Sequence, residues 1–299
     1  LPLVNVFHDR EYTTLGVSSN IYASSSHGFA TGFDQFYETR RPLNPKGLNP
    51  FANVRRLQKD REPSRQDYVR TFVDAVTHEH PMVSLGNFGR TVALELDRRY
   101  SLREHLPFVR SDKYGYLTRA TQRSRQLLLE AFRTRSDGES LFAFANYMNT
   151  HSPYEPSKDH FEAVADSDLD YESLADIEPD ISSPFTFLNE YFGDGIDEDS
   201  MELIRAAYRG EVHSVDEQVN TLLRTLGDEG ELEDTVVVIT SDHGEALGEQ
   251  DLNGERGMGH LPYLNENLWT VPLIIAHPDI ESNTVEHRVS LKSLTALLM

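Results

Sequence analysis

The sequence of 299 residues contains no cysteine. Disulfide bonds and cysteine-ligated zinc sites are therefore excluded within it. It also lacks any apolar run close to the roughly 18 residues that a membrane helix needs, so no membrane segment is expected in this chain. No positively charged start followed by an apolar stretch marks a secretory leader. A cytoplasmic location is favoured, and any localisation signal is expected in an amino-terminal region outside the chain.

Positive charge is scarce as well. The chain has 28 lysines and arginines against 49 acids, a net charge of −21, and only five of the 28 are lysines. This balance favours a protein made for high salt, with an ordinary acidic enzyme as the alternative. The negative field argues against nucleic acid as a partner. At roughly 1 M salt the screening length is only about 3 Å, so charges inside a site would decide the binding of an anion.

Apolar runs alternate with stretches of helical periodicity. Apolar residues recur every three or four positions in residues 117–135 and again from residue 201, as in a helix. Nearly continuous apolar runs occupy residues 141–148, 235–240 and 271–276. Such runs are typical of strands that are covered on both faces. The alternation predicts an α/β fold with a mostly parallel central sheet and helices on both faces.

Two further segments differ in composition from the rest. Residues 38–66 are rich in proline, arginine and asparagine and are expected to be irregular surface or a weak boundary. Residues 159–200 are strongly acidic and are expected to form an insertion, as a solvated loop or a lid.

Polar residues follow two of the predicted strands, at the end where open α/β sheets bind their ligands, and a third polar cluster follows a glycine turn. Asp242 and His243 come directly after the strand 235–240, and a neighbouring carboxylate and imidazole can hold one divalent cation. His151 follows the run 141–148 and is placed to act as an acid or to contact a substrate. His260 follows a glycine turn. Each cluster alone is compatible with an ordinary loop, but their coincidence at one sheet edge indicates a site.

The order of these motifs resembles the sulfatase family of the alkaline phosphatase superfamily. The similarity lies in residues 208–219, 234–249 and 259–275, and residues 148–156 resemble the His-x-Pro-Tyr loop of that family. Residues 14–37 are similar to the segment that follows its nucleophile. The resemblance is weakest between residues 40 and 115. It implies that residues 1–299 form a single, incomplete sulfatase-like catalytic domain.

The resemblance also implies roles for individual residues. Asp242 and His243 would be ligands of one divalent metal, which is usually calcium in sulfatases and magnesium, manganese or zinc in phosphoryl-transfer relatives. His151 would contact the ester and protonate its leaving oxygen. His260 occupies the position where many sulfatases have a lysine that binds the sulfate group.

Substrate contacts are also implied near residue 20. Ser19 and Asn20 belong to a segment in which many sulfatases carry a lysine and a histidine, and Asn20 can still donate a hydrogen bond to substrate. The paired acid and the nucleophile of the family are expected to precede Leu1. A formylglycine, which sulfatases make from cysteine, is therefore expected outside this chain. The 299 residues alone are predicted to be inactive.

These patterns favour a metal-dependent hydrolase of sulfuric esters that acts on a small-molecule or glycan sulfate ester. One alternative is a phosphodiesterase or phosphoglycerol transferase of the same superfamily, with threonine or serine as nucleophile. The other alternative is a catalytically inactive homologue that binds anions or glycans.

The sequence Pro63-Ser64-Arg65 is similar to part of the nucleophile turn of the family, but it lies at the wrong place in the chain and is predicted to be a surface turn.

Overall fold

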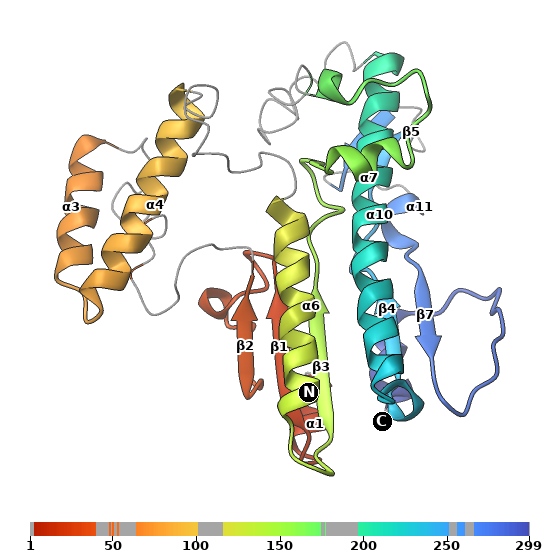
Figure 1. Ribbon diagram of the computed structural model, residues 1–299. Coiled ribbons are helices and arrows are strands. Elements are labelled where there is room, and N and C mark those ends of the chain that lie inside the picture. Colours follow the sequence, from red (N-terminus) through yellow and green to blue (C-terminus); the bar gives the residue numbers. More distant parts are fainter. Residues whose placement is uncertain are drawn as a thin grey trace. The chain divides into compact units, whose positions relative to one another are not determined.

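The computed structural model describes residues 3–39, 64–100, 116–174, 197–250, 256–260 and 266–298, together with residues 48, 50, 53 and 177. The chain divides into two compact units (Figure 1). Unit 1 comprises Leu1–Thr39 and Tyr114–Met299, and unit 2 comprises Arg40–Lys113. All the residues predicted to form the site belong to unit 1.

The core of unit 1 is a three-stranded parallel sheet in the order β2-β1-β3. Its central strand, β1 (Thr13–Ser18), pairs with β2 (Gln35–Glu38) on one side and with β3 (Leu141–Asn146) on the other. Strand β1 is buried along almost its whole length, because it has a parallel neighbour at each edge. The predicted α/β class with a parallel sheet is confirmed.

Two further strand pairs of unit 1 are antiparallel. Strand β4 (Val237–Thr240) pairs with β7 (Leu273–Ala276), and β5 (Ala246–Gln250) pairs with β6 (Arg256–Gly259). The apolar runs at 235–240 and 271–276 are therefore strands, as predicted, but they run in opposite directions. A continuous apolar run reports burial and carries no information on strand direction, so the arrangement is a mixed α/β one.

Two long helices pack beside these strands, α6 (Tyr116–Thr134) and α10 (Glu198–Asp228) (Figure 1). Helix α6 buries Leu127 and Leu128 against Leu15 and Val17 of β1. Helix α10 begins at Asp197, whose side chain accepts a hydrogen bond from the Ser200 amide, and acidic residues in its first turn complement the helix dipole. Gly230, with φ of 78°, follows the carboxyl end of α10. Both helices begin and end close to the predicted positions.

The acidic segment is packed at its amino-terminal end. Helix α7 (Lys158–Glu162) and the 3₁₀ turn η2 (Tyr171–Ser173) bury Phe161 and Tyr171 in one cluster with Ile204 of α10. The first part of the predicted insertion is thus part of the core. Most of the remaining acidic segment lies outside the described residues, and the lid stays a prediction.

Unit 2 contains helices α3 (Arg65–Val76) and α4 (Pro81–Tyr100), which pack together through the rings of Phe72 and Phe88 at 5.4 Å. Ser64 begins α3 as its N-cap and donates to Asp67 Oδ2 at 2.7 Å. Ser64 and Arg65, predicted to belong to a surface turn, therefore start a helix, while Pro63 lies outside the described residues. Most of the segment 38–66 lies outside the described residues.

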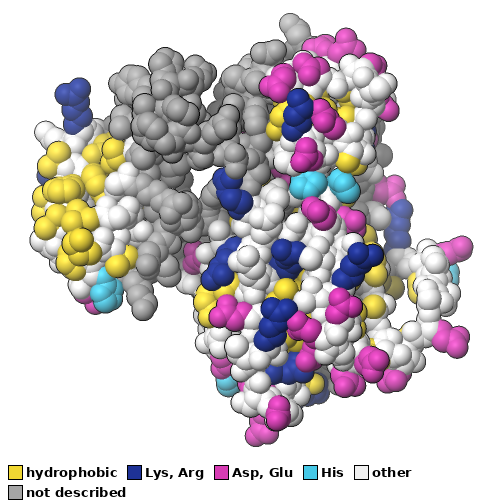
Figure 2. All heavy atoms as spheres, viewed as in Figure 1, with side chains coloured by type: hydrophobic (Ala, Val, Ile, Leu, Met, Phe, Trp, Pro, Cys, Tyr) yellow, Lys and Arg dark blue, Asp and Glu magenta, His cyan; other side chains and the backbone are white. Residues whose placement is uncertain are grey.

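Short elements complete the described chain. They are α1 (Leu3–His8), η1 (Ser25–His27), η3 (Leu232–Asp234), α11 (Glu266–Trp269), η4 (Leu291–Ser293) and α12 (Leu294–Leu297). Acidic side chains are spread over the face that carries α6 and α10, with lysine and arginine side chains between them (Figure 2). Within the described part of the chain, no helix combines the length and the hydropathy required to cross a membrane.

Candidate active site

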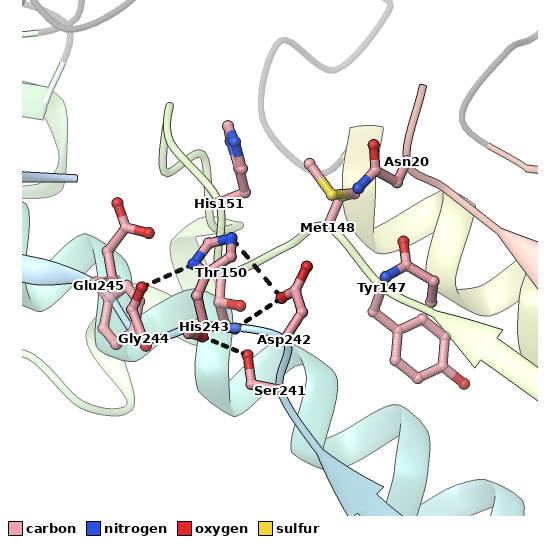
Figure 3. A pocket seen from close by; sticks show the side chains of 12 residues that line it. Asn20, Tyr147, Met148, Thr150, His151, Ser241, Asp242, His243, Gly244 and Glu245 are labelled. Atoms are coloured by element: carbon pink, nitrogen blue, oxygen red, sulfur yellow. Dashed lines mark hydrogen bonds and ion pairs between the residues drawn. The ribbon is translucent and has the colours of Figure 1, made fainter. Parts of the chain in front are cut away.

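A pocket lies where the loops that follow β1, β3 and β4 converge (Figure 3). Asn20 comes from the loop after β1, residues 146–148, 150 and 151 come from the end of β3 and its loop, and residues 241–245 come from the loop after β4. Tyr208 of α10 completes one wall. The predicted residues that line the pocket are Asn20, His151, Asp242 and His243. The structure therefore brings together segments that are far apart in sequence, at the sheet edge expected for a ligand.

The loop after β4 is fixed by a glycine. The Gly244 amide donates to Leu268 O at 2.9 Å, and a Cβ atom at position 244 would lie 1.7 Å from Asn267 O. Only glycine fits there, because any side chain would overlap the backbone next to it. Ser241 Oγ donates to His243 O at 2.6 Å and closes the turn from inside. The positions of Asp242 and His243 are set by this packing.

His243 presents one ring nitrogen toward Asp242. Its Nδ1 lies 2.8 Å from Gly244 O, so a neutral imidazole carries its proton on Nδ1 and keeps the lone pair on Nε2. That Nε2 lies 3.7 Å from Asp242 Oδ1 (Figure 3). The Asp242 side chain is 71% exposed. A carboxylate oxygen and an imidazole nitrogen that face one another at this separation can bind a common cation.

A second acid, Glu245, lies beside the same imidazole. One ligand atom from each of His243, Glu245 and His260 lies within 4.8 Å of the others, a group able to hold a metal ion. The Glu245 side chain is only 5% exposed, and Tyr154 Oη donates to its Oε1 at 3.0 Å. Sequence reasoning did not single out Glu245. The available signal was its position directly after the Asp-His-Gly turn, at the entry to β5.

His260 is brought between the other two histidines. Its ring centroid lies 4.4 Å from that of His243 and 5.0 Å from that of His151. His260 Nδ1 lies 3.4 Å from Glu245 Oε2, an ion-pair distance without the geometry of a good hydrogen bond. The Glu245 carboxylate raises the pKa of His260, partial burial lowers it, and Asp242 adds a smaller raising effect. A protonated His260 favours an anion, whereas a neutral one can bind a metal.

His151 lies on the loop that follows β3. Its Nδ1 is 2.6 Å from Ser152 O, a contact that orients the ring, and its backbone amide donates to Met148 O at 3.1 Å. The loop therefore turns sharply just before the histidine, and the side chain stands at the rim of the pocket (Figure 3).

The two residues predicted to contact substrate near position 20 differ in their surroundings. Asn20 lines the pocket, and its Oδ1 accepts a hydrogen bond from the Tyr22 amide at 2.8 Å. Ser19 is buried, and its hydroxyl donates to Asn146 O at 3.0 Å, which ties the loop after β1 to β3. Ser19 is not among the pocket-lining residues. The substrate roles of both residues remain predictions.

Two tyrosines of the pocket wall are held in the neutral form. Burial raises the pKa of Tyr147 to about 12. Burial, followed by the charges of Glu245 and Glu249, raises the pKa of Tyr208. A neutral phenol keeps its proton and can donate a hydrogen bond to an anion.

The sequence model of the sulfatase family matches residues 2–299. The chain belongs to the sulfatase family. It is 26% identical over 125 residues to an arylsulfatase of Clostridium perfringens, a match that covers 41% of this chain and 26% of the relative. It is 27% identical over 139 residues to a choline-sulfatase of Rhizobium meliloti, covering 45% of this chain and 26% of that protein.

The chain is also similar to a solved structure described as BT4656 in complex with its substrate, D-glucosamine-2-N,6-O-disulfate. The identity is 14% and the TM-score is 0.46, and the match covers 92% of this chain and 55% of that one. The matched region of the two enzymes spans only about a quarter of the length of each of them.

Members of the family typically bind a divalent metal. The mixed nitrogen and oxygen donors of His243, Glu245 and His260 suit such an ion.

Proposed function

We propose that the protein containing this chain is a metal-dependent hydrolase of sulfuric esters. The observation that carries the proposal is that Asp242, His243 and His151 line one pocket, with the ring of His260 next to those of His243 and His151, in a chain of the sulfatase family. Transfer of a sulfuryl group develops negative charge on the equatorial and leaving oxygens. Such a reaction needs a cation, fixed donors and an acid, and the pocket supplies residues for each of these.

Asp242 and His243 are proposed as metal ligands, with Glu245 next to them as a further oxygen donor. A divalent cation at this place would stabilise the developing charge and lower the pKa of the nucleophile. The hydrogen bond from His243 Nδ1 to Gly244 O favours the tautomer whose Nε2 lone pair would be free to bind the ion.

The donor types bear on the identity of the metal. Calcium prefers oxygen ligands, whereas imidazole nitrogen suits manganese and zinc. Because His243 would contribute an imidazole nitrogen beside the carboxylate oxygens of Asp242 and Glu245, we propose manganese or zinc ahead of calcium, the metal that the family resemblance favours. The thermal midpoint of the full-length protein, measured with each ion at equal concentration, decides between them. A larger rise with calcium than with manganese or zinc would overturn this assignment.

His151 is proposed as the acid that protonates the leaving oxygen, and His260 as a contact for the sulfate group. General acid catalysis of this kind typically contributes about 10²–10⁴-fold. The raised pKa of His260 extends the pH range in which this side chain carries a positive charge toward an anion. We propose a small-molecule or glycan sulfate ester as the substrate class.

The reaction type is tested with the full open reading frame that contains these residues. Turnover of p-nitrophenyl sulfate well above that of p-nitrophenyl phosphate supports the proposal. Faster turnover of p-nitrophenyl phosphate would indicate a phosphoryl-transfer activity instead of a sulfatase activity. If the protein hydrolyses neither ester but is still stabilised by metal, the result would favour a binding protein. The 299 residues alone are expected to be inactive, since the nucleophile is proposed to lie outside them.

A further inference from the structure

A buried carboxylate lies beneath the loop that carries His151. Glu211 of α10 is fully buried and does not line the pocket. Its Oε2 accepts a hydrogen bond from Asn149 Nδ2 at 3.0 Å, and its Oε1 accepts one from the Glu155 backbone amide at 3.1 Å. Asn149 and Glu155 stand on either side of His151 in the sequence. One carboxylate therefore holds both ends of the loop 149–155.

The Asn149 amide group is fixed from two sides. Its oxygen accepts a hydrogen bond from Thr121 of α6, while its nitrogen donates to Glu211 of α10. All three side chains are fully buried. The first end of the loop is thus attached to two helices, two residues before His151.

The second end of the loop lies against α10 because of a glycine. A Cβ atom at Gly210 would lie 2.9 Å from Pro156 Cβ, so a larger residue at this position would push the loop away from the helix. This close approach brings the Glu155 amide within reach of Glu211. Between the two ends, Tyr154 Oη donates to Glu245 Oε1 at 3.0 Å and connects the loop to the proposed metal-binding turn.

The chemistry of the two contacts calls for a carboxylate. Both groups that reach Glu211 are N–H donors, and a carboxylate accepts at both of its oxygens. A glutamine would have to turn its own NH₂ group toward one of the donors, so it can satisfy only one of the two contacts. Burying a carboxylate is costly, and the pKa of Glu211 is raised to about 7 by burial in spite of the two hydrogen bonds.

We propose that Glu211 is a positioning residue that clamps the loop 149–155 at both ends and thereby directs His151 at the leaving oxygen of the ester. This inference rests on the proposed role of His151 as general acid. Glu211 touches neither the ester nor the metal, and its effect on the reaction passes through the loop alone. A displacement of about 1 Å in a catalytic group can cost about 10²-fold in rate.

The test compares Glu211→Gln with the control Ser214→Ala in the full-length protein. Ser214 is also fully buried on α10, but its hydroxyl pairs with Thr118 and not with the loop. Two sulfate esters are used, one with a nitrophenol and one with a sugar alcohol as leaving group. A poor leaving group needs protonation and a good one does not. We expect Glu211→Gln to lower kcat for the sugar sulfate at least about tenfold and to leave p-nitrophenyl sulfate nearly unchanged, while Ser214→Ala changes neither.

We expect His151→Ala also to lower kcat for the sugar sulfate and to leave p-nitrophenyl sulfate nearly unchanged. The double variant with Glu211→Gln should hydrolyse the sugar sulfate no more slowly than His151→Ala alone. Equal losses on both esters, or additive losses in the double variant, would overturn the clamp. If His151→Ala itself shows no dependence on the leaving group, the proposed acid role fails, and the clamp as stated fails with it.

A measurement independent of activity separates these two failures. Hydrogen exchange at the Glu155 amide should be slow in the wild-type protein and faster by about tenfold or more in Glu211→Gln, with no change in Ser214→Ala. Unchanged exchange in Glu211→Gln would overturn the clamp itself, whatever the enzyme hydrolyses. Faster exchange in an enzyme whose His151→Ala variant lacks leaving-group dependence would show that the loop is clamped for another purpose.

Discussion

Replacing Glu211 by glutamine removes a buried titratable group and should change how stability depends on pH. The pKa of Glu211 rises from its usual 4.5 to about 7 on folding, chiefly because of burial. Between these values the native state keeps a proton that the unfolded chain has released. The free energy of unfolding therefore falls as pH rises from 4.5 to about 7, and it levels off above that.

The size of the effect follows from the two pKa values. Each pKa unit corresponds to about 1.4 kcal/mol, so the interval from 4.5 to about 7 corresponds to about 3 kcal/mol. Glutamine does not titrate. Relative to that of the wild-type protein, the free energy of unfolding of the variant should increase by about 3 kcal/mol between pH 4.5 and pH 8. At every pH it is also lowered by about 1–3 kcal/mol, because glutamine cannot make one of the two hydrogen bonds.

Urea denaturation at four pH values from 4.5 to 8 measures this difference, because the other titrating groups cancel between the two proteins. Ser214→Ala is the matched control, and its difference from the wild-type protein should not depend on pH. If the difference in free energy of unfolding between Glu211→Gln and the wild-type protein stays constant with pH, or moves in favour of the wild-type protein as pH rises, then Glu211 does not have a raised pKa in the native state.

Three further changes test the rest of the site. Asp242→Asn or His243→Ala should abolish the rise of the thermal midpoint on adding divalent metal, and an undiminished rise would remove that residue from the ligand set. Gly244→Ala should destabilise the fold by about 3 kcal/mol or more in urea denaturation, because its Cβ would overlap Asn267 O; a loss below about 0.5 kcal/mol would contradict this packing. Ser19→Ala should cost about 1 kcal/mol of stability with KM unchanged, since its hydroxyl bonds to the backbone of β3, and a raised KM would instead support substrate contact.

Periodicity and burial patterns located the main elements of unit 1. Helix α6 and strand β3 lie where the sequence predicts them, because an apolar stripe every three or four residues favours a helix and a short unbroken apolar run is typical of a buried strand. The direction of β7 against β4 was not predictable in this way. Direction depends on how the chain returns to the sheet, and residues 241–272 carry no periodic signal for that path.

The site was predictable only in part. His151 could be anticipated because the parallel strand β3 delivers the residues after it to the sheet edge. Asp242 and His243 were anticipated by the same rule, but their strand β4 belongs to an antiparallel pair, and the loop after it reaches the pocket through the tertiary fold. Glu245 lay next to the recognised turn, yet its burial under Tyr154 follows from the tertiary fold alone. Glu211 is one of three polar residues, with Ser214 and Gln218, that are buried among the apolar side chains of α10. Its partners lie 56 to 62 positions away in the sequence, and no local pattern reveals them.

We propose above that Asp242 helps to hold a divalent metal that drives hydrolysis of a sulfuric ester. The most direct test follows p-nitrophenyl sulfate turnover by the full open reading frame, before and after treatment with a chelator, in the wild-type protein and in Asp242→Asn. We expect chelation to abolish turnover, and added metal to restore turnover in the wild-type protein but not in the variant. Turnover that survives chelation, or that returns equally in both proteins, would contradict the proposal.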